Sequence, residues 1–151
     1  MYLRDVYLDD DSFKNDFSNK VINTQKYNVL AKYILGKLET RYGGAEPEMS
    51  AKQLSVEHIL PESPTEEWSR LFSNTDIENY IYRIGNFTLL ETNKNRVADR
   101  KAFVEKKAIY QTSSYQLSKQ TIHADEWMPS SVVARQRELA KNALTIWKIS
   151  Y

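Results

Sequence analysis

VEHILP at residues 56–61 and IGNFTLL at residues 84–90 decide the fold of this chain. Both are short apolar runs, and such runs predict strands, here over 54–60 and 84–90. The first run ends at Pro61, and Gly85 in the second indicates a close approach of the backbone to another element. The chain turns helical from Asn93, with a break expected at Asp99, which could cap a second helix through Lys107. Two strands and a helix therefore form the expected centre of the domain.

Longer helices are predicted on both sides of this centre. Over 20–42 apolar residues recur at helical spacing, and Gly43-Gly44 supplies the stop. Another helix follows Pro129, and its wide apolar face needs a partner, most simply the helix over 20–42. The apolar stripes consist of Val29, Leu30, Tyr33, Ile34 and Leu38 in the first helix and of Val133, Ala140, Leu144 and Trp147 in the last.

Two capping boxes lie between the predicted strands, SPTE at 63–66 and TDIE at 75–78, and they predict short helices near 64–72 and 76–82. The segment 111–128 has no clear pattern. The expected fold class is α+β and mostly helical. We expect a single domain over 1–151, with a core at about 54–110 and helical flanks at 10–43 and 129–149.

The composition narrows the class of protein. A chain of 151 residues with 41% hydrophobic residues can bury the core of one domain. No apolar run approaches the ~20 residues of a membrane span, and the first residues lack the pattern of a secretory signal. The absence of cysteine excludes disulfides and thiolate metal sites. We expect a cytoplasmic protein that has no membrane partner.

The pair Glu57-His58 and the later Asn95 predict a hydrolytic site. A neutral imidazole at the end of a strand can take a proton from water, and its ordinary pKa of about 6.5 suits that task. Carboxylate and amide oxygens are ligands for Mg²⁺ or Mn²⁺, so Glu57 and Asn95 are the predicted metal ligands. Neighbouring strand residues point to opposite faces, so both members of the pair reach one site only where the strand ends or bends, near Pro61.

A block of basic residues begins beside Asn95. Residues 93–107 contain six basic and two acidic residues, a net charge of +4, in a chain whose total is +1. Arg96, Arg100, Lys101 and Lys106 are the predicted contacts to a phosphate backbone. The alternative is a solvated helix face that binds nothing.

These motifs resemble the HNH nucleases, also called His-Me finger or ββα-metal nucleases. More narrowly, they resemble the C-terminal nuclease domain of GmrSD-type modification-dependent restriction enzymes. The resemblance covers roughly residues 10–148. It is carried by residues 56–61 and 84–90, by Asn95, by Phe103, Lys106 and Tyr110, and by Trp127, Arg137, Leu139-Ala140 and Trp147.

The resemblance implies a role for each site residue. His58 would be the general base, Glu57 a metal ligand directly or through water, and Asn95 the second ligand. Asn86 would brace the loop and help to orient His58. The wider family usually has Asp where this chain has Glu57, and the paired zinc-binding cysteines of many members are missing here. The long helices would then hold the finger in their place.

The resemblance also implies partners. The substrate would be DNA, with or without modified bases, cut or nicked in a bacterial restriction or phage-defence system. An N-terminal nucleotide-hydrolysing domain with a ParB-like fold would act with the nuclease. This chain, which has no phosphate-binding glycine loop, would be the C-terminal part of such a protein or a short relative.

Three alternatives remain open at this point. The chain could be a degenerate finger that binds DNA without cutting it, or a helical interaction domain in which the site is a coincidence. His58 could also be a structural histidine, Asn86 a turn residue and Asn95 only a helix cap.

Overall fold

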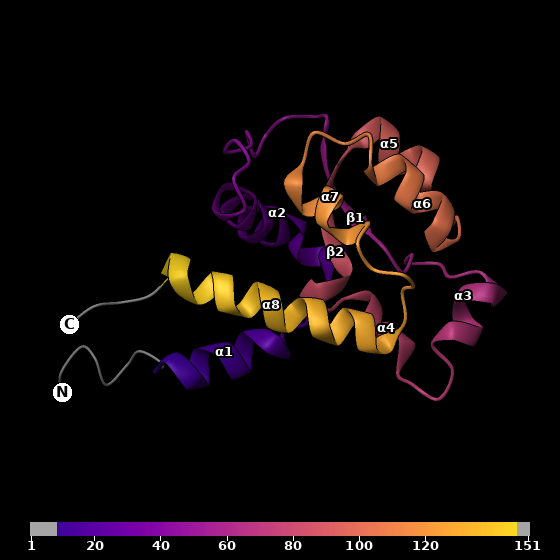
Figure 1. The fold of residues 1–151 in the computed structure, drawn as a ribbon, viewed down its shortest axis with the longest axis horizontal. Helices are drawn as coiled ribbons and strands as arrows, with labels where there is room; N and C mark the ends of the chain where they lie inside the picture. The colour runs from indigo at the N-terminus through magenta and orange to yellow at the C-terminus, as the bar shows by residue number, and fades with distance from the viewer. Residues whose placement is uncertain (1–8, 148–151) are drawn as a thin grey trace.

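The computed structural model describes residues 9–147. They form a mostly helical α+β fold around one two-stranded sheet, which confirms the expected fold class (Figure 1). The strands are β1 (Leu54–His58) and β2 (Phe87–Glu91). The helices are α1 (Asp10–Ser18), α2 (Thr24–Arg41), α3 (Glu66–Leu71), α4 (Ile77–Ile81), the short 3-10 helix η2 (Ile84–Asn86), α5 (Thr92–Ala98), α6 (Phe103–Tyr110), α7 (Gln116–Thr121) and α8 (Pro129–Trp147).

The strands pair antiparallel, with Leu54 opposite Glu91 and His58 opposite Phe87. Helix α5 follows β2 directly, so the two strands and α5 form the expected ββα unit. Because side chains alternate along a strand, one face of the sheet carries His58 with Phe87 and the other carries Glu57 with Thr88. The first face meets α2, and the second meets α6 and α7.

The sheet lies between two apolar clusters. Leu35 and Leu38 of α2 pack with Phe87 and Leu89 of β2 and with Leu139 of α8 in the first. The second joins α3, α4 and α6 to the remaining face, and its largest members are Trp68, Phe72, Phe103, Tyr110 and Trp127. Both faces of both strands are therefore buried, which fixes the register of the pair.

The long helices differ from the sequence prediction in position and partner. Helix α2 starts at Thr24 behind the N-cap Asn23, and its buried stripe is Ala31, Leu35 and Leu38. The predicted stripe was wrong at Val29, which is 80% exposed, and at Leu30 and Tyr33, which are also exposed. Apolar residues occur on more than one face of this helix, so periodicity alone could not select the face that meets the sheet.

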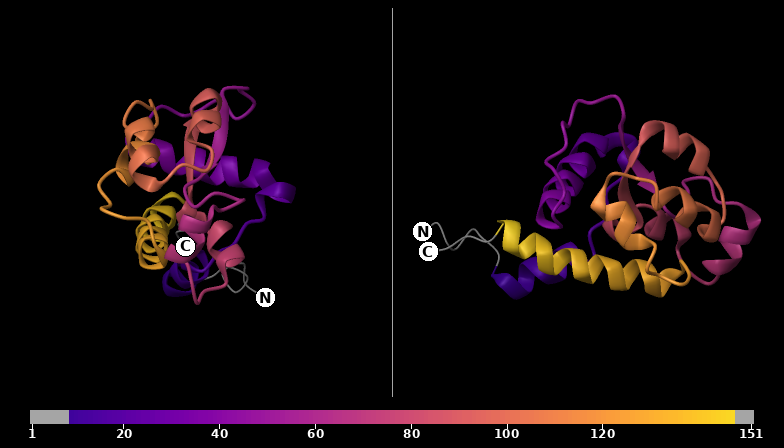
Figure 2. Two further views of the ribbon diagram at one scale, coloured as in Figure 1. Left: turned by 90° about the vertical axis from the view of Figure 1, so that its right-hand side faces the viewer. Right: turned by 45° about the horizontal axis from the view of Figure 1, so that its top comes forward.

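Helix α8 packs chiefly along α1 and makes a smaller contact with α2, whereas α2 was the expected partner (Figures 1 and 2). Helix α1 lies within the predicted helical flank 10–43, in which a separate helix was assigned only over 20–42, because the apolar residues of α1 are few and its first turn is acidic. Asp9 caps it by accepting a hydrogen bond from the backbone of Ser12. The predicted flank 129–149 is described as far as Trp147, and residues 148 and 149 lie outside the described part.

The N-caps of three short helices lie one to three residues from the predicted positions. Thr65, not Ser63, caps α3, and Asp76, not Thr75, caps α4. Asp99 ends α5 with a positive φ of 40° and does not start α6, whose first residue follows Ala102. Helix α7 lies in the segment for which no pattern was found. Within residues 9–147, no helix combines the length and apolar character needed to cross a membrane.

Candidate active site

A cavity of about 540 Å³ opens where β1 ends and α5 begins. It brings together most of the residues that the motifs singled out, from the end of β1, the turn after it, and α5. Its lining consists of Glu57, His58, Pro61, Glu62, Ser63, Thr92, Asn95, Arg96, Asp99 and Arg100. The predicted residues Asn86, Lys101 and Lys106 are not part of this lining.

His58 is held on both sides of its ring. Its Nε2 lies 2.8 Å from the hydroxyl of Thr24 at the start of α2, and its ring meets Phe87 and Tyr82 edge-on at 5.1 and 6.0 Å. Its Nδ1 lies 3.8 Å from a carboxylate oxygen of Glu62, another residue of the cavity. The contact with Thr24 thus leaves Nδ1 as the ring nitrogen on the side of Glu62.

Burial lowers the pKa of His58 to about 4, and the positive charge of Lys106 acts in the same direction. The Glu62 carboxylate opposes this shift. His58 is only 8% exposed, so desolvation of its charged form dominates. The imidazole is therefore neutral at pH 7, the state in which it can accept a proton.

Glu57 lies on the opposite face of β1 from His58, as strand alternation requires, yet both residues reach the cavity. Its Oε2 accepts a hydrogen bond from the Tyr110 hydroxyl at 2.9 Å and lies 3.4 Å from the Lys106 ammonium. Burial raises the pKa of Glu57 and lowers that of Lys106, and the charge of each partner opposes the shift of the other. Both contacts use Oε2, and a backbone hydrogen bond from His58 also acts on the carboxylate.

Asn95 stands on α5 with its amide nitrogen against β1. Nδ2 donates to the hydroxyl of Ser55 at 2.9 Å and to the carbonyl of Val56 at 3.1 Å. A carbonyl can only accept, so these contacts determine which way the amide faces and turn Oδ1 away from the strand. Asn95 also lines the cavity.

This donor set fits a hard cation that keeps most of its waters. Nowhere in residues 9–147 do three His, Cys, Asp or Glu side chains lie close enough to form a metal site by themselves. The carboxylate of Glu57 and the amide of Asn95, in a cavity that Glu62 and Asp99 also line, match the few protein oxygen ligands that Mg²⁺ takes. In residues 9–147 the sole buried side-chain polar atom without a partner is Nη2 of Arg135, so no oxygen of Glu57 or Asn95 is both buried and unpaired.

Asn86 is completely buried and makes no contact with the cavity. Its Oδ1 accepts from the backbone of Leu60 at 2.8 Å and from the Trp127 indole at 3.0 Å, and its Nδ2 donates to the carbonyls of Leu60 and Ile81. Asn86 thus ties the residues after His58 to α4 and to the segment before α8. These hydrogen bonds fix the course of the chain just after His58.

Arg96 and Arg100 line the cavity, as a phosphate-binding role would require. The guanidinium of Arg100 also donates to the carbonyls of Ser63 and Pro64, which fixes it over the turn after β1. Lys101 is exposed, and its carbonyl accepts from the indole of Trp68 at 2.9 Å.

Lys106 requires a correction. The basic block predicted a phosphate contact, but its side chain is 0% exposed. Its ammonium donates to the carbonyls of His58 at 2.9 Å and Ile59 at 3.1 Å, besides its contact with Glu57. A phosphate cannot reach a cation enclosed in this way. Lys106 instead holds the end of β1, the segment that carries His58.

The family model for the C-terminal domain of GmrSD restriction endonucleases matches residues 7–142. The chain belongs to this family. The match extends from before α1 into α8, so it includes both strands, α5 and every residue of the cavity, and it confirms the narrower resemblance. The GmrSD family consists of restriction endonucleases, and its nuclease domains act on DNA. A comparison with curated proteins finds no match.

Three residues of this GmrSD domain were missed by the sequence analysis: Thr24, Glu62 and Tyr82. The Tyr82 hydroxyl donates to Glu62 at 2.8 Å, and Gln25 supplies a longer contact of 3.4 Å to the same oxygen. Thr24 and Tyr82 are 34 and 24 residues from His58 and meet it only through the fold. Glu62 comes four residues after His58, so its nearness to the VEHILP motif was the one available signal.

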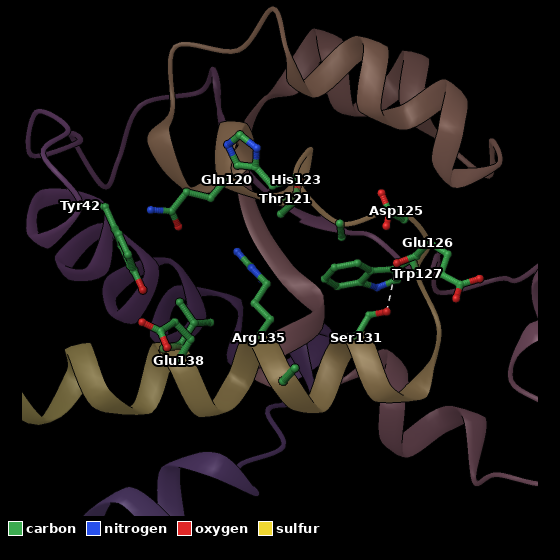
Figure 3. A pocket seen from close by; sticks show the side chains of 13 residues that line it. Tyr42, Gln120, Thr121, His123, Asp125, Glu126, Trp127, Ser131, Arg135 and Glu138 are labelled. Carbon is green, nitrogen blue, oxygen red and sulfur yellow. Dashed lines mark hydrogen bonds between the residues drawn. The ribbon is translucent and has the colours of Figure 1, made fainter.

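A larger cavity of about 680 Å³ lies beside the start of β2, between α8 and the segment after α7 (Figure 3). Arg135 rises into it from α8, and its Nη1 donates to the carbonyls of Gly85 and Phe87. Burial lowers the pKa of Arg135 to about 10. In the GmrSD domain this arginine therefore supports β2 at the position opposite His58.

Proposed function

We propose that this GmrSD C-terminal domain is a metal-dependent DNA endonuclease or nickase of the HNH type. His58 would activate a water for attack on a phosphodiester, with Glu57 and Asn95 holding Mg²⁺ or Mn²⁺. The observation that carries the proposal is that these three side chains, from β1 and α5, line one cavity together with two arginines. Family membership supports nuclease action on DNA.

The chain's own residues account for proton transfer and orientation. The neutral imidazole of His58 accepts a proton at Nδ1, while Thr24 holds Nε2. Arg96 and Arg100 would bind non-bridging oxygens of the phosphate, where charge grows in the transition state. A bound divalent ion would supply further stabilisation of the charge on the phosphate and on the leaving oxygen.

A plasmid-nicking assay tests the proposal, with Mg²⁺, with Mn²⁺ and with EDTA. The wild-type chain is expected to convert supercoiled plasmid to open-circle or linear DNA only when a divalent ion is present. His58→Ala should lower the rate by about 10²- to 10⁴-fold, the range for loss of a general base. His123→Ala is the matched control, because His123 is the only other histidine and lies outside the cavity. Equal activity of the two variants would remove His58 from the mechanism.

A second candidate function is a DNA-binding module that does not cut. It is favoured by the contacts of Glu57, which gives one oxygen to Tyr110 and Lys106 and so has less capacity for a metal. Salt-dependent DNA binding without cleavage under Mg²⁺, Mn²⁺ or any other divalent metal would support this candidate over the first.

The wider biological setting is also a proposal, and it rests on the resemblance to GmrSD-type systems. The domain would act on bacterial or phage DNA in the cytoplasm, with an N-terminal ParB-like nucleotide-hydrolysing domain or subunit that selects modified DNA. Comparing cleavage of modified and unmodified phage DNA, with and without such a partner, tests the dependence on modification.

A further inference from the structure

A basic pocket of about 350 Å³ lies on the seam between α1 and α8, away from the residues of the candidate active site. The two helices run side by side in the three views of the fold (Figures 1 and 2). Lys14, Arg83, Arg137 and Lys141 line the pocket, and none of its described lining residues is acidic. Four cations around one hollow give a site that attracts anions.

Arg83 distinguishes this pocket from a patch of surface lysines, because its side chain is held by several contacts and is only 9% exposed. Its Nε donates to Gln136 at 3.0 Å, its Nη2 donates to the carbonyl of Ser18 at 2.6 Å, and its guanidinium carbon lies 5.6 Å from the ring centre of Tyr80. Within residues 9–147 the remaining nitrogen, Nη1, has no acceptor and is not buried. The fold thus fixes an N–H donor in advance and leaves it available to a ligand.

The other three cations are only weakly neutralised by the protein. Lys14 lies 3.8 Å from Asp11 and Lys141 lies 3.7 Å from Glu138, and both pairs are exposed to solvent. Exposed pairs of this kind contribute little free energy, so an incoming anion can replace them. Arg137 is exposed and forms no ion pair with any side chain in residues 9–147.

The pocket is joined to the candidate active site by a short connection. Arg83 forms an isolated β-bridge with Val21, and Ile22 donates to the carbonyl of Tyr82. Tyr82 in turn packs on the ring of His58, and the same connection leads to Thr24. One turn of duplex DNA is about 34 Å long, so a bound duplex can extend beyond a single cavity of a domain of this size.

We propose that the pocket formed by Lys14, Arg83, Arg137 and Lys141 binds a backbone phosphate of the DNA substrate, outside the scissile phosphate. The inference rests on the proposed action on DNA and adds a second anchoring point to it. Phosphate is the indicated chemistry because a fixed guanidinium N–H and mobile cations surround the hollow. DNA is the phosphate source because the family acts on DNA.

The test is DNA binding at several salt concentrations, measured by fluorescence anisotropy with a short labelled duplex. All proteins carry His58→Ala, so that cleavage does not interfere. Arg137→Gln is expected to weaken binding about threefold or more at low salt and to reduce the slope of log K against log salt by about 1. Arg41→Gln is the matched control, since Arg41 is an exposed helix arginine outside the pocket, and it should change neither quantity.

Two results would overturn the inference. One is an unchanged salt slope in Arg137→Gln and also in the double variant Lys14→Gln/Arg137→Gln. The other is binding of inorganic pyrophosphate that depends on Arg137 while DNA affinity does not, which would assign the pocket to a free phosphate compound. Neither result bears on cleavage by the protein with its native His58, so failure of the anchor and failure of the nuclease are distinguishable.

Discussion

Thr24 and His58 are 34 positions apart in the chain, and their side chains meet at 2.8 Å in the interior. This contact links the first turn of α2 to the strand end that carries the proposed base. It determines which nitrogen of the imidazole is available, because Nε2 is already hydrogen-bonded to the hydroxyl of Thr24.

Replacing Thr24 should therefore affect catalysis more than binding. Thr24→Val has nearly the same shape and lacks the hydroxyl, so the His58 ring would lose its orientation. We expect a fall in kcat of about 10- to 100-fold, typical of groups that orient a catalytic residue, with little change in KM. Thr24→Ser should recover most of the rate. A loss of rate in Thr24→Ser equal to that in Thr24→Val would contradict an orienting role for the hydroxyl.

The low pKa of His58 should make the fold sensitive to acid. The unfolded chain has a histidine pKa near 6.5 and the folded chain one of about 4, so the unfolded state binds more protons between these values. Stability contributed by the neutral ring is complete above about pH 6.5 and is lost as the pH falls to 4. At pH 5 the loss from this group is about 2 kcal/mol.

Urea denaturation at pH 7 and pH 5 measures this loss, with His58→Asn as the comparison. The variant should lose less stability between the two pH values than the native chain. An equal loss in both proteins would assign the acid sensitivity to other groups, such as carboxylates that become protonated.

Lys106 should matter for folding and not for DNA contact. Lys106→Met would leave Glu57 buried without its cation, and breaking a buried pair on one side costs about 3–5 kcal/mol. The double variant Glu57→Gln/Lys106→Met removes both charges and should recover much of that loss, as a urea denaturation series would record. If the double variant were no more stable than the single one, the 3.4 Å contact would not be an energetic pair.

Asn95 should contribute to metal binding as well as to the fold. Asn95→Ser removes the amide oxygen and also the two hydrogen bonds that the amide nitrogen makes to β1. We expect Asn95→Ser to weaken Mn²⁺ binding about tenfold or more in calorimetric titration. The loss of the two hydrogen bonds should lower the free energy of unfolding in urea by about 1–3 kcal/mol. Unchanged Mn²⁺ affinity would exclude the amide as a ligand.

The parts of this structure that sequence could predict are local. The strands, α5 and the grouping of Glu57, His58 and Asn95 arise from motifs in which a few neighbouring residues determine strand, turn and helix. The buried side of α6 could also have been predicted, since Phe103, Lys106 and Tyr110 share one face at spacings of three and four. Lys106 was assigned to the surface because its charge was considered and this periodicity was not.

The remainder depended on contacts between distant segments. Nothing near His58 indicates that a threonine 34 residues earlier will contact its ring, and the apolar residues of α2 do not reveal which side faces the sheet. Cap positions shifted because Ser63 and Thr65 both satisfy the same local rule, and only packing of Trp68 decides between them.

Gln136 connects the segment before β2 to α1 and α8. Its amide accepts from Arg83 and Gly85 and donates to the carbonyls of Phe17 and Lys20, and a side chain at Gly85 would collide with the backbone of Val132. Cutting the chain before Pro129 would remove these four hydrogen bonds at once, together with the two that Arg135 donates to Gly85 and Phe87. The two strands therefore depend on α8 for their conformation. Transferred to another protein without α8, they would not keep this structure even though their own sequence is unchanged.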